Sequence, residues 1–304
     1  MNNNYETSNN YIDILSCPVC GESIHEPQYQ IPYISTKLPE LLSIKNPRKI
    51  FMQKCPVCSH YFASPIINPE LIDQYYSGHN SEIYDVNCPD PVDKSKRQRN
   101  KLRSIIEKLH PEGNEILDIG CGTSFLLSYF DGSKWERYGV EPSQYASGLA
   151  ERKGIKILGR YVDDAIQSGK KFDVVVMTDV IEHLPDPKPL LEDVCKILKP
   201  HGYLAIETGN IHSLNARIAK SHWSYFSTQE HVSFYNPASI KYLLKKYGFH
   251  DIQIRHKSAF GNRLANLYKF LKNILIIIAH HTVLQNKKYY LALTFDHFTI
   301  IAKK

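Results

Sequence analysis

Between residues 115 and 302 the chain alternates short apolar runs with amphipathic segments, which is typical of a doubly wound parallel sheet. The apolar runs predict seven strands, at 115–119, 137–141, 155–158, 172–177, 201–207, 249–255 and 297–302. Helical spacing predicts helices at 94–109, 143–153, 187–198 and 237–247. The expected fold class is α/β, with a mostly parallel, seven-stranded, Rossmann-like sheet.

The N-terminal part lacks this alternation and instead contains the tetrapeptide Cys-Pro-Val-Cys twice. The two copies place thiols at Cys17 and Cys20, and at Cys55 and Cys58. Two such hairpins can complete a tetrahedral thiolate site, so we predict a structural zinc in a small zinc-ribbon-like domain. A pair of disulfides and unrelated buried cysteines are the alternatives, and His60 is a substitute ligand.

Composition shifts suggest the domain boundaries. The expected parts are a disordered tail at 1–13, a zinc-binding domain at 14–65, a linker or lid at 66–100, and a catalytic domain at 101–304 with insertions at about 209–236 and 263–292. The second insertion has apolar residues at helical spacing. We favour a helix docked on the sheet or on a second subunit, over an interfacial helix that contacts a lipid-linked acceptor.

The overall composition, 42% apolar and 22% charged residues, is ordinary for a soluble globular protein. The longest aliphatic run, 274–279, is too short to span a bilayer, and residues 1–10 lack the apolar core of a signal peptide. The paired cysteines suit a reducing compartment, so we expect a cytoplasmic protein. From Lys241 onward, twelve Lys and Arg face two Asp and Glu, which favours either an anionic partner or a solvated helix face.

A glycine-rich turn follows the first predicted strand. Asp118, Gly120 and Gly122 lie in the stretch Glu-Ile-Leu-Asp-Ile-Gly-Cys-Gly, where glycine permits φ > 0 and close approach of a ligand. The next strand ends at Glu141, a position from which a carboxylate can accept hydrogen bonds from two ribose hydroxyls. The turn and the acidic strand end together indicate a nucleotide-type cofactor.

Four segments, 116–122, 140–143, 172–187 and 198–204, resemble in order and spacing the class I S-adenosylmethionine-dependent methyltransferases. The resemblance implies S-adenosylmethionine as cofactor. The contacts it implies are Asp118, Gly120 and Gly122 at the methionine part, Glu141 at the ribose, Tyr161, Val162 and Asp163 along the adenine, and Thr178 and Asp179 in the pocket wall.

This sequence departs from the family pattern at two places. Thr123 and Ser124 replace the third glycine of the usual turn, so the start of the following helix must tolerate a small side chain. The usual acid after the third strand falls on Tyr161, with Asp163 two places on.

The flanking segments are similar to methyltransferases of sugar and polysaccharide biosynthesis, which carry a four-cysteine domain and an aromatic insertion. This similarity implies a small-molecule acceptor, a nucleotide-linked or lipid-linked sugar. His231, preceded by Glu230, is the favoured general base, because histidine titrates near neutral pH. His231 packed as a lid residue is the alternative. The aromatic side chains from Trp223 to Phe226 form either a stacking wall for the acceptor or ordinary core.

The favoured function is O- or N-methylation of such an acceptor. The alternatives are an RNA-directed methyltransferase, a sugar C-methyltransferase and a non-catalytic zinc-module binding protein. Nucleic acid is disfavoured because the chain lacks an Asn/Asp-Pro-Pro-Tyr/Phe motif and a Pro-Cys motif outside the knuckles. C-methyltransferases of this group carry a further C-terminal domain for which this chain has no room. A homodimer and peripheral membrane contact stay open.

Overall fold

The computed structural model describes residues 5–8, 10–24, 27–31, 37–77, 92–213, 216–217, 223–227, 229–256 and 296–304. They belong to two compact units, each made of separate stretches of chain. One unit comprises Met1–Ile67, Gly209–Ser239 and Arg255–Phe298; the other comprises Asn68–Thr208, Ile240–Ile254 and Thr299–Lys304. We call them the cysteine unit and the sheet unit. The predicted insertion at 263–292 and residues 78–91 of the predicted linker lie outside the described residues.

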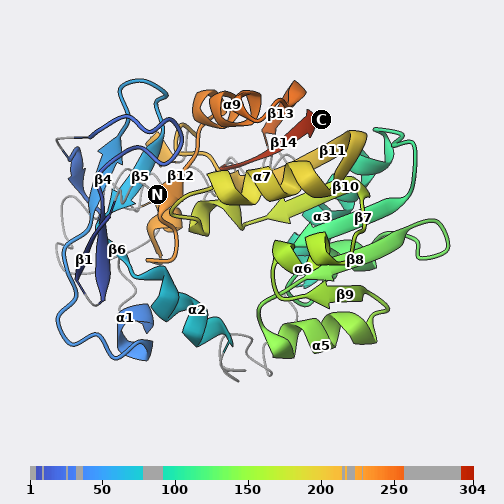
Figure 1. Cartoon of the computed structure of the whole chain (residues 1–304), viewed down its shortest axis with the longest axis horizontal. Coiled ribbons are helices and arrows are strands. Elements are labelled where there is room, and N and C mark those ends of the chain that lie inside the picture. The colour runs from blue at the N-terminus through green and yellow to red at the C-terminus, as the bar shows by residue number, and fades with distance from the viewer. Residues whose placement is uncertain are drawn as a thin grey trace. The chain divides into compact units, whose positions relative to one another are not determined.

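A seven-stranded sheet organises the sheet unit (Figure 1). In sheet order its strands are β13 (His250–His256), β14 (His297–Lys303), β11 (Leu198–Gly209), β10 (Phe172–Thr178), β7 (Glu115–Ile119), β8 (Glu136–Val140) and β9 (Lys156–Gly159). The strands from β11 to β9 pair in parallel. The predicted mostly parallel, seven-stranded sheet is confirmed.

The strand order reverses beside β7. Strands β8 and β9 follow it on one side, whereas β10 lies on its other side. The first six residues of β10 are buried, as its continuous apolar sequence requires at the centre of a covered sheet. In such sheets ligands bind beyond the carboxyl ends of the strands at this switch point. The turns after β7 and β10 are therefore where a site is expected.

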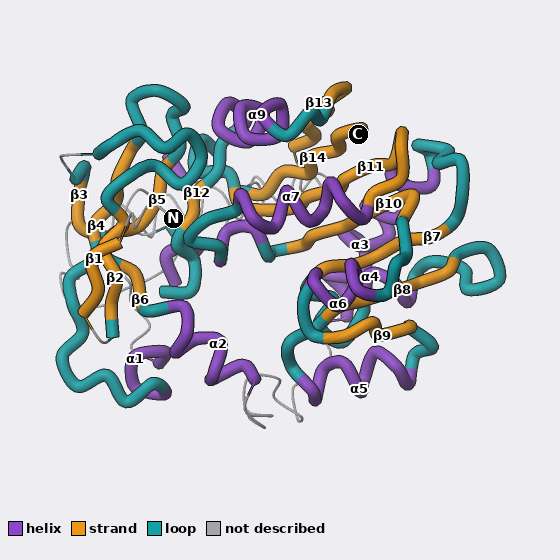
Figure 2. Tube along the Cα trace, in the orientation of Figure 1, coloured by secondary structure: helices purple, strands orange, loops and turns teal. Residues whose placement is uncertain are grey.

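Helices cover both faces of this sheet (Figure 2). The described helices of the sheet unit are α2 (Pro69–Ser77), α3 (Val92–Glu107), α4 (Phe125–Ser128), α5 (Gln144–Arg152), α6 (Val162–Gln167), α7 (Lys188–Ile197), α9 (Pro237–Lys246) and the short 3-10 helix η1 (Ile181–His183), of which α2 lies away from the sheet. The predicted amphipathic helix before the first strand is confirmed as α3, whose Leu102 and Ile106 pack into the core with Leu127 and Phe130. Within the described part of the chain, no helix is long and apolar enough to cross a membrane.

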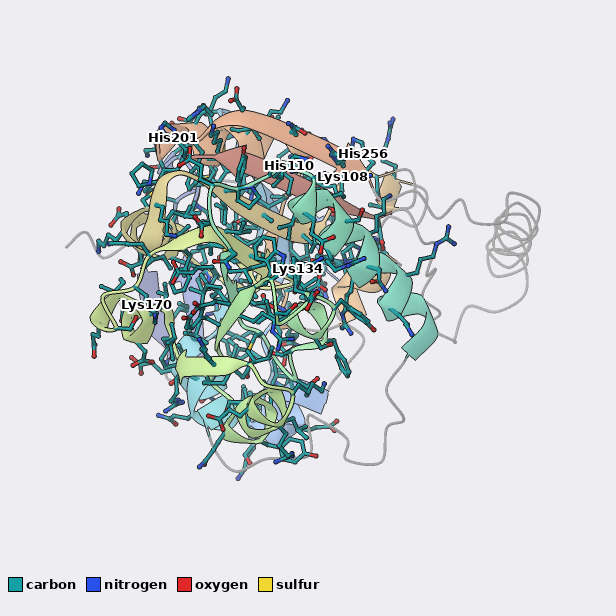
Figure 3. All side chains as sticks on the ribbon, turned by 90° about the vertical axis from the view of Figure 1, so that its right-hand side faces the viewer. Lys108, His110, Lys134, Lys170, His201 and His256 are labelled. Atoms are coloured by element: carbon teal, nitrogen blue, oxygen red, sulfur yellow. The ribbon has the colours of Figure 1, made fainter. Side chains whose placement is uncertain are left out.

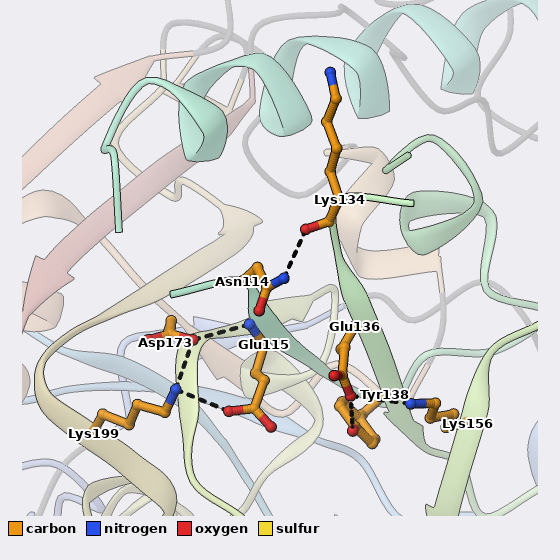
Figure 4. Close-up of polar contacts among 8 residues, drawn as sticks. All are labelled: Asn114, Glu115, Lys134, Glu136, Tyr138, Lys156, Asp173 and Lys199. Atoms are coloured by element: carbon orange, nitrogen blue, oxygen red, sulfur yellow. Dashed lines mark hydrogen bonds and ion pairs between the residues drawn. The ribbon is translucent and has the colours of Figure 1, made fainter. Parts of the chain in front are cut away.

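The amino ends of the strands are occupied by polar contacts (Figure 4). Asp173, 4% exposed, accepts hydrogen bonds from the Glu115 N–H and from Lys199 Nζ, each at 2.9 Å, and Lys199 also pairs with Glu115 at 2.8 Å. His110, Lys134 and other basic side chains lie on the loops at this edge (Figure 3). Because these contacts occupy the amino edge, the carboxyl edge is left for a ligand.

The cysteine unit contains two small sheets. One has the order β1 (Tyr5–Ser8), β2 (Tyr11–Ile14) and β6 (Ile66–Ile67); the other has the order β12 (Ser233–Phe234), β5 (Tyr61–Ser64), β4 (Phe51–Lys54) and β3 (Tyr29–Gln30). The helices of this unit are α1 (Lys37–Leu41) and the 3-10 helix η3 (Ser224–Ser227).

Two expected boundaries differ from the structure. Within the tail at 1–13, Tyr5–Ser8 and Tyr11–Ile14 are strands rather than disordered chain, because β1 pairs with β2 and β2 with β6 in antiparallel ladders. The insertion near 209–236 was assigned to the catalytic domain, but its strand β12 pairs with β5, so Gly209–Ser239 belongs to the cysteine unit.

Candidate functional site

A tight turn after β7 carries both predicted glycines. Gly120 and Gly122 adopt φ angles of 68° and 52°, in the left-handed region that favours glycine. The N–H groups of Gly120 and Cys121 donate to the Val140 carbonyl oxygen at 2.9 and 3.2 Å, which ties the turn to β8. A Cβ atom at position 120 would lie 2.8 Å from Val180 Cγ2. Both the conformation and the space therefore require glycine there.

Ser124 stands where the resemblance leads one to expect a third glycine. It is fully buried and adopts φ 57°, ψ 43° at the start of α4, without capping the helix through its side chain. A left-handed backbone costs a non-glycine residue about 1–2 kcal/mol. The turn thus accepts a small side chain at this position, as the sequence requires, at a cost in backbone strain.

Glu141, directly after β8, links the glycine turn to the start of α5. One carboxylate oxygen accepts the Gly122 N–H at 2.8 Å, and the other accepts the Ser143 N–H at 2.8 Å. Only 5% of Glu141 is exposed. Each carboxylate oxygen has two lone pairs, so both oxygens can still accept a hydroxyl. This arrangement fits a carboxylate that receives a ribose diol.

Asp118 lies one residue before the end of β7 and is 2% exposed. Its Oδ1 has no hydrogen-bond partner among the described residues. Burial first, and then the negative charge of Glu141, raise the pKa of Asp118 to about 8, while the positive charge of Arg99 lowers it. A buried carboxylate oxygen without a donor fits a ligand that brings a cationic N–H group, such as the ammonium of S-adenosylmethionine.

We expect S-adenosylmethionine to bind more weakly as the pH falls from about 8 to about 6, by up to tenfold per unit, because only the ionised Asp118 attracts the ammonium. Glu141, Arg99 and the Cys121 thiol surround this carboxyl. Isothermal titration calorimetry across this range checks the slope, and Asp118→Asn should abolish most of it. An unchanged slope in Asp118→Asn would show that another group titrates.

The same carboxyl affects folding stability with a defined sign. Its pKa in the folded chain, about 8, lies above its ordinary value of 3.8. The folded state therefore holds a proton that the unfolded chain has released, and without cofactor this group lowers the stability progressively as the pH rises from about 4 toward 8.

Two cations flank the ring of Phe125, at the first residue of α4, and sequence reasoning missed both. The Arg99 guanidinium of α3 lies 4.6 Å from the ring centroid, and Lys153 Nζ lies 3.9 Å from it. Lys153 also donates to the Thr123 carbonyl oxygen at 2.8 Å. The sequence shows only that the helix before the glycine turn is basic, and it does not single out Arg99 among its basic residues. The charge of Arg99 lies close enough to influence Asp118.

The residues predicted along the adenine lie at the start of α6. Tyr161 is the N-cap residue and is 41% exposed, and its hydroxyl donates to Asp73 of α2. Val162 is buried and Asp163 is exposed. Asp164, rather than Asp163, accepts the backbone N–H of Tyr161, at 3.0 Å. Adenine contact by these residues stays a prediction.

The predicted pocket wall after β10 is built around a left-handed residue. Thr178 ends the strand, and Asp179 follows with φ 54° and donates its N–H to the Glu207 carbonyl oxygen at 3.0 Å. Next comes η1, in which Glu182 is fully buried and accepts the Thr208 hydroxyl at 2.8 Å. The structure thus gathers Asp118, Thr178 and Asp179 at the carboxyl edge of neighbouring strands.

The aromatic side chains of the 209–236 insertion form part of the core of the cysteine unit. Trp223, Tyr225 and Phe226 are each at most 6% exposed. Trp223 stacks on Tyr225 at 4.8 Å, and its Nε1 donates to Asp296 Oδ2 at 3.1 Å. Tyr225 also packs against Phe234. It therefore belongs to the core rather than to a stacking wall for the acceptor.

His231 continues this aromatic stack. Its ring lies 4.2 Å from that of Tyr225, and its Nδ1 is 2.7 Å from the Tyr225 carbonyl oxygen. Because a carbonyl only accepts, Nδ1 carries the proton, and Nε2 is the basic nitrogen of the neutral ring. Glu230 precedes it and is partly buried. This tautomer suits a general base, but the catalytic roles of His231 and Glu230 stay predictions.

The four knuckle cysteines converge in the cysteine unit. Cys17 and Cys58 Sγ are 3.5 Å apart, Cys20 and Cys55 Sγ are 3.4 Å apart, and all four sulfurs lie within 4.8 Å of one another. The pKa of Cys17 is lowered to about 6, chiefly by the hydrogen bond with Cys58, and the same bond raises the pKa of Cys58. One ion bound by all four sulfurs fits this arrangement better than two unrelated pairs.

Both knuckles repeat one backbone pattern. The N–H of the first cysteine donates to the carbonyl of the residue five positions on, Glu22 or His60, at 2.7 and 2.8 Å. The residue after the second cysteine is left-handed in both, Gly21 at φ 88° and Ser59 at φ 58°. His60 itself is fully buried, its pKa is lowered to about 3 by burial, and it does not join the four sulfurs.

A family model described as a methyltransferase domain matches residues 95–254, more than half of the chain. The chain belongs to this methyltransferase family. The match covers Asp118, Glu141 and the turn after β10. The methyl donor is S-adenosylmethionine. The prediction of an S-adenosylmethionine-dependent methyltransferase is confirmed.

Similar proteins include two ubiquinone biosynthesis O-methyltransferases. That of Idiomarina loihiensis is 27% identical over 205 residues, covering 62% of this methyltransferase and 82% of the relative. That of Thiobacillus denitrificans is 25% identical over 162 residues, covering 49% of this chain and 69% of the relative. Magnesium protoporphyrin IX methyltransferase from Synechocystis PCC 6803, solved with bound SAH, has a TM-score of 0.50 at 16% identity, covering 78% of this chain and 100% of that one, and shows the fold.

Proposed function

We propose that this methyltransferase transfers a methyl group from S-adenosylmethionine to a hydroxyl oxygen of a small-molecule acceptor. The observation that carries the donor half is the pair of buried carboxylates beside the glycine turn. Asp118 has an oxygen without a donor among the described residues, and Glu141 accepts two backbone N–H groups. The oxygen acceptor is supported by the two O-methyltransferase relatives.

The bound donor supplies an electrophilic methyl carbon on a sulfonium, and the protein supplies its binding and alignment. Glu141 would accept the ribose hydroxyls, Asp118 would receive the ammonium, and Arg99 would attract the carboxylate of the methionine part. Tyr161, Val162 and Asp163 would contact the adenine, and Thr178 and Asp179 would form the wall of the pocket.

The acceptor has two candidate classes. The sequence favours a sugar-containing acceptor, nucleotide-linked or lipid-linked, on its resemblance to sugar methyltransferases. The relatives reported above carry ubiquinone biosynthesis in their names, which favours a different small molecule. RNA and a carbon atom of a sugar remain as further acceptors to be separated by experiment.

Labelled methyl transfer from S-adenosylmethionine into a fractionated extract tests the proposal. Products are separated as nucleotide sugars, lipid-linked glycans, quinone lipids and RNA, and the labelled bond is tested for its stability as an ether. We expect label in one small-molecule fraction, on oxygen. Label confined to RNA, or no transfer by a protein that binds the donor, would contradict the proposal.

His231 as general base is tested in the same assay. Replacement by glutamine keeps a side chain that can donate to the Tyr225 carbonyl but removes the titratable nitrogen. Loss of kcat with unchanged donor affinity is the expected result, about 100-fold for a general base. Full kcat would leave His231 as a packing residue.

We also propose that the four cysteines hold a structural zinc. Tetrahedral coordination with Zn–S bonds of 2.3 Å places sulfurs about 3.8 Å apart, close to the separations of 3.4 and 3.5 Å found here. A site of four thiolates has no open position, so it contributes stability rather than chemistry.

A further inference from the structure

A pocket of about 740 Å³ lies within the cysteine unit. One side is a face of the four-stranded sheet. Lys54 and Tyr61 are cross-strand partners on β4 and β5, and Tyr29 pairs with Met52, two residues before Lys54, so the three side chains share that face. The volume suits a small ligand of several ring systems.

The opposite wall comes from the chain after β11. Its described residues include His212, Arg217, Trp223 and Phe226. Trp223 and Phe226 are almost fully buried and pack edge to face at 5.3 Å, so they form the rigid inner wall. His212 and Arg217 are exposed at the mouth of the pocket. The two walls meet at Tyr61, because the edge of one ring packs against the face of the other between Tyr61 and His212, with 5.6 Å between the ring centroids.

Positive charge gathers at this mouth. Lys54 Nζ lies 5.4 Å from the centre of the Tyr61 ring. Tyr61 therefore lies between Lys54 and the ring of His212, and both His212 and Arg217 line the pocket. The pKa of His212 is lowered, first by burial and then by the positive charges of Lys54 and Arg217. No Asp or Glu is among the described residues that line the pocket. Within the described part of the chain neither Lys54 nor Arg217 forms an ion pair with an acid. Such cations attract an anion, and Arg binds phosphate in bidentate geometry.

The backbone at His212 and Arg217, and the side chain of Trp223, make hydrogen bonds within the cysteine unit. The His212 N–H donates to Asn210 Oδ1 at 3.0 Å, and the Arg217 N–H donates to the Ser213 carbonyl at 3.0 Å. Trp223 is held by its hydrogen bond to Asp296. A few polar groups beside an apolar wall are typical of small-molecule sites.

We propose that this pocket binds a nucleoside diphosphate group, with its phosphates at Arg217, Lys54 and His212 and its base against the tyrosine-lined face. The aromatic rings favour a ligand with a planar part, and the cations beside them favour one with an anionic part, which a neutral sugar lacks. This inference rests on the proposed function in one respect: the nucleoside diphosphate would be the part of a nucleotide-linked acceptor that the pocket holds.

Tryptophan fluorescence tests it in the full chain without methyl transfer, so its failure is distinguishable from failure of the proposed function. The chain has two tryptophans, and Trp135→Phe leaves Trp223 in the pocket wall as the sole reporter. We expect UDP to change this emission with saturation, and uridine and inorganic pyrophosphate each to bind at least about 10-fold more weakly, because each lacks one half of the contacts.

Arg217→Gln should weaken UDP binding about 10- to 100-fold and leave uridine binding unchanged, since only the phosphates need the cation. Arg152→Gln, an exposed arginine at the end of α5, is the matched control and should bind UDP normally. No saturable change with UDP, equal binding of pyrophosphate and UDP, or an equal loss in Arg152→Gln would each overturn the proposal. Tyr61→Leu, if folded by circular dichroism, should weaken uridine and UDP alike.

Discussion

Replacing Glu141 by alanine is expected to weaken S-adenosylmethionine binding by at least about 100-fold. Hydrogen bonds to a charged acceptor contribute about 1.5–3 kcal/mol each, and two ribose hydroxyls would lose their acceptor together. The same change leaves the Gly122 and Ser143 N–H groups without the carboxylate that now accepts them at 2.8 Å. Titration calorimetry with the donor measures the loss directly.

Two further variants separate binding from folding. Glu141→Gln keeps a carbonyl oxygen for one of the N–H groups, so it should fold better than the alanine variant and still bind the donor weakly. Glu136→Ala removes an exposed glutamate at the opposite end of the same strand and should bind normally. Full affinity in Glu141→Ala would refute the ribose assignment, and equal loss in Glu136→Ala would show a general effect on β8.

Removing the metal, by chelation or by Cys55→Ser, is expected to unfold the cysteine unit. Structural zinc contributes about 10–16 kcal/mol to folding in small zinc domains, as much as the whole stability of a typical domain. The purified chain should contain about one zinc per molecule by mass spectrometry, and the variant should have little. In thermal unfolding followed by near-ultraviolet circular dichroism, the variant should lack the transition that belongs to the cysteine unit.

The matched control for this experiment is Cys195→Ser. Cys195 lies on α7 in the sheet unit, and its thiol donates to the Tyr247 carbonyl at 3.6 Å, a bond that serine can replace. This variant should keep the metal and the unfolding profile. A metal-free, stably folded chain with four unreactive cysteine sulfurs would instead show that the pairs are disulfides.

The sheet was predictable from sequence because short apolar runs, such as that of β10, alternate along the chain with amphipathic segments. The turn after β7 was predictable because position 120 requires glycine. Its φ angle is positive, and a Cβ atom there would lie only 2.8 Å from Val180 Cγ2. Glu141 followed from its place after an apolar strand. In each case the physical requirement falls on a few consecutive residues, so a local pattern reveals it.

Arg99, β12 and the role of the aromatic insertion were not predictable in this way. Arg99 lies on a helix with many basic residues, and only the fold shows that its charge acts on Asp118. The two residues of β12 are too few to form a pattern, although their pairing with β5 transfers the insertion to the cysteine unit. From sequence, aromatic residues of the core cannot be distinguished from aromatic residues that line a ligand pocket, because both kinds of site are apolar.

The pairing of β12 with β5 also has a consequence for the order of folding. His60 and Ser233, whose side chains are 3.4 Å apart, are 173 positions apart in sequence. During synthesis the four cysteines emerge early, but the last strand of their sheet emerges only after β7 to β11 have been made. Contacts this distant form slowly. On the ribosome the four cysteines are therefore all present well before the sheet beside them is complete, so the proposed zinc has its whole ligand set before this unit closes.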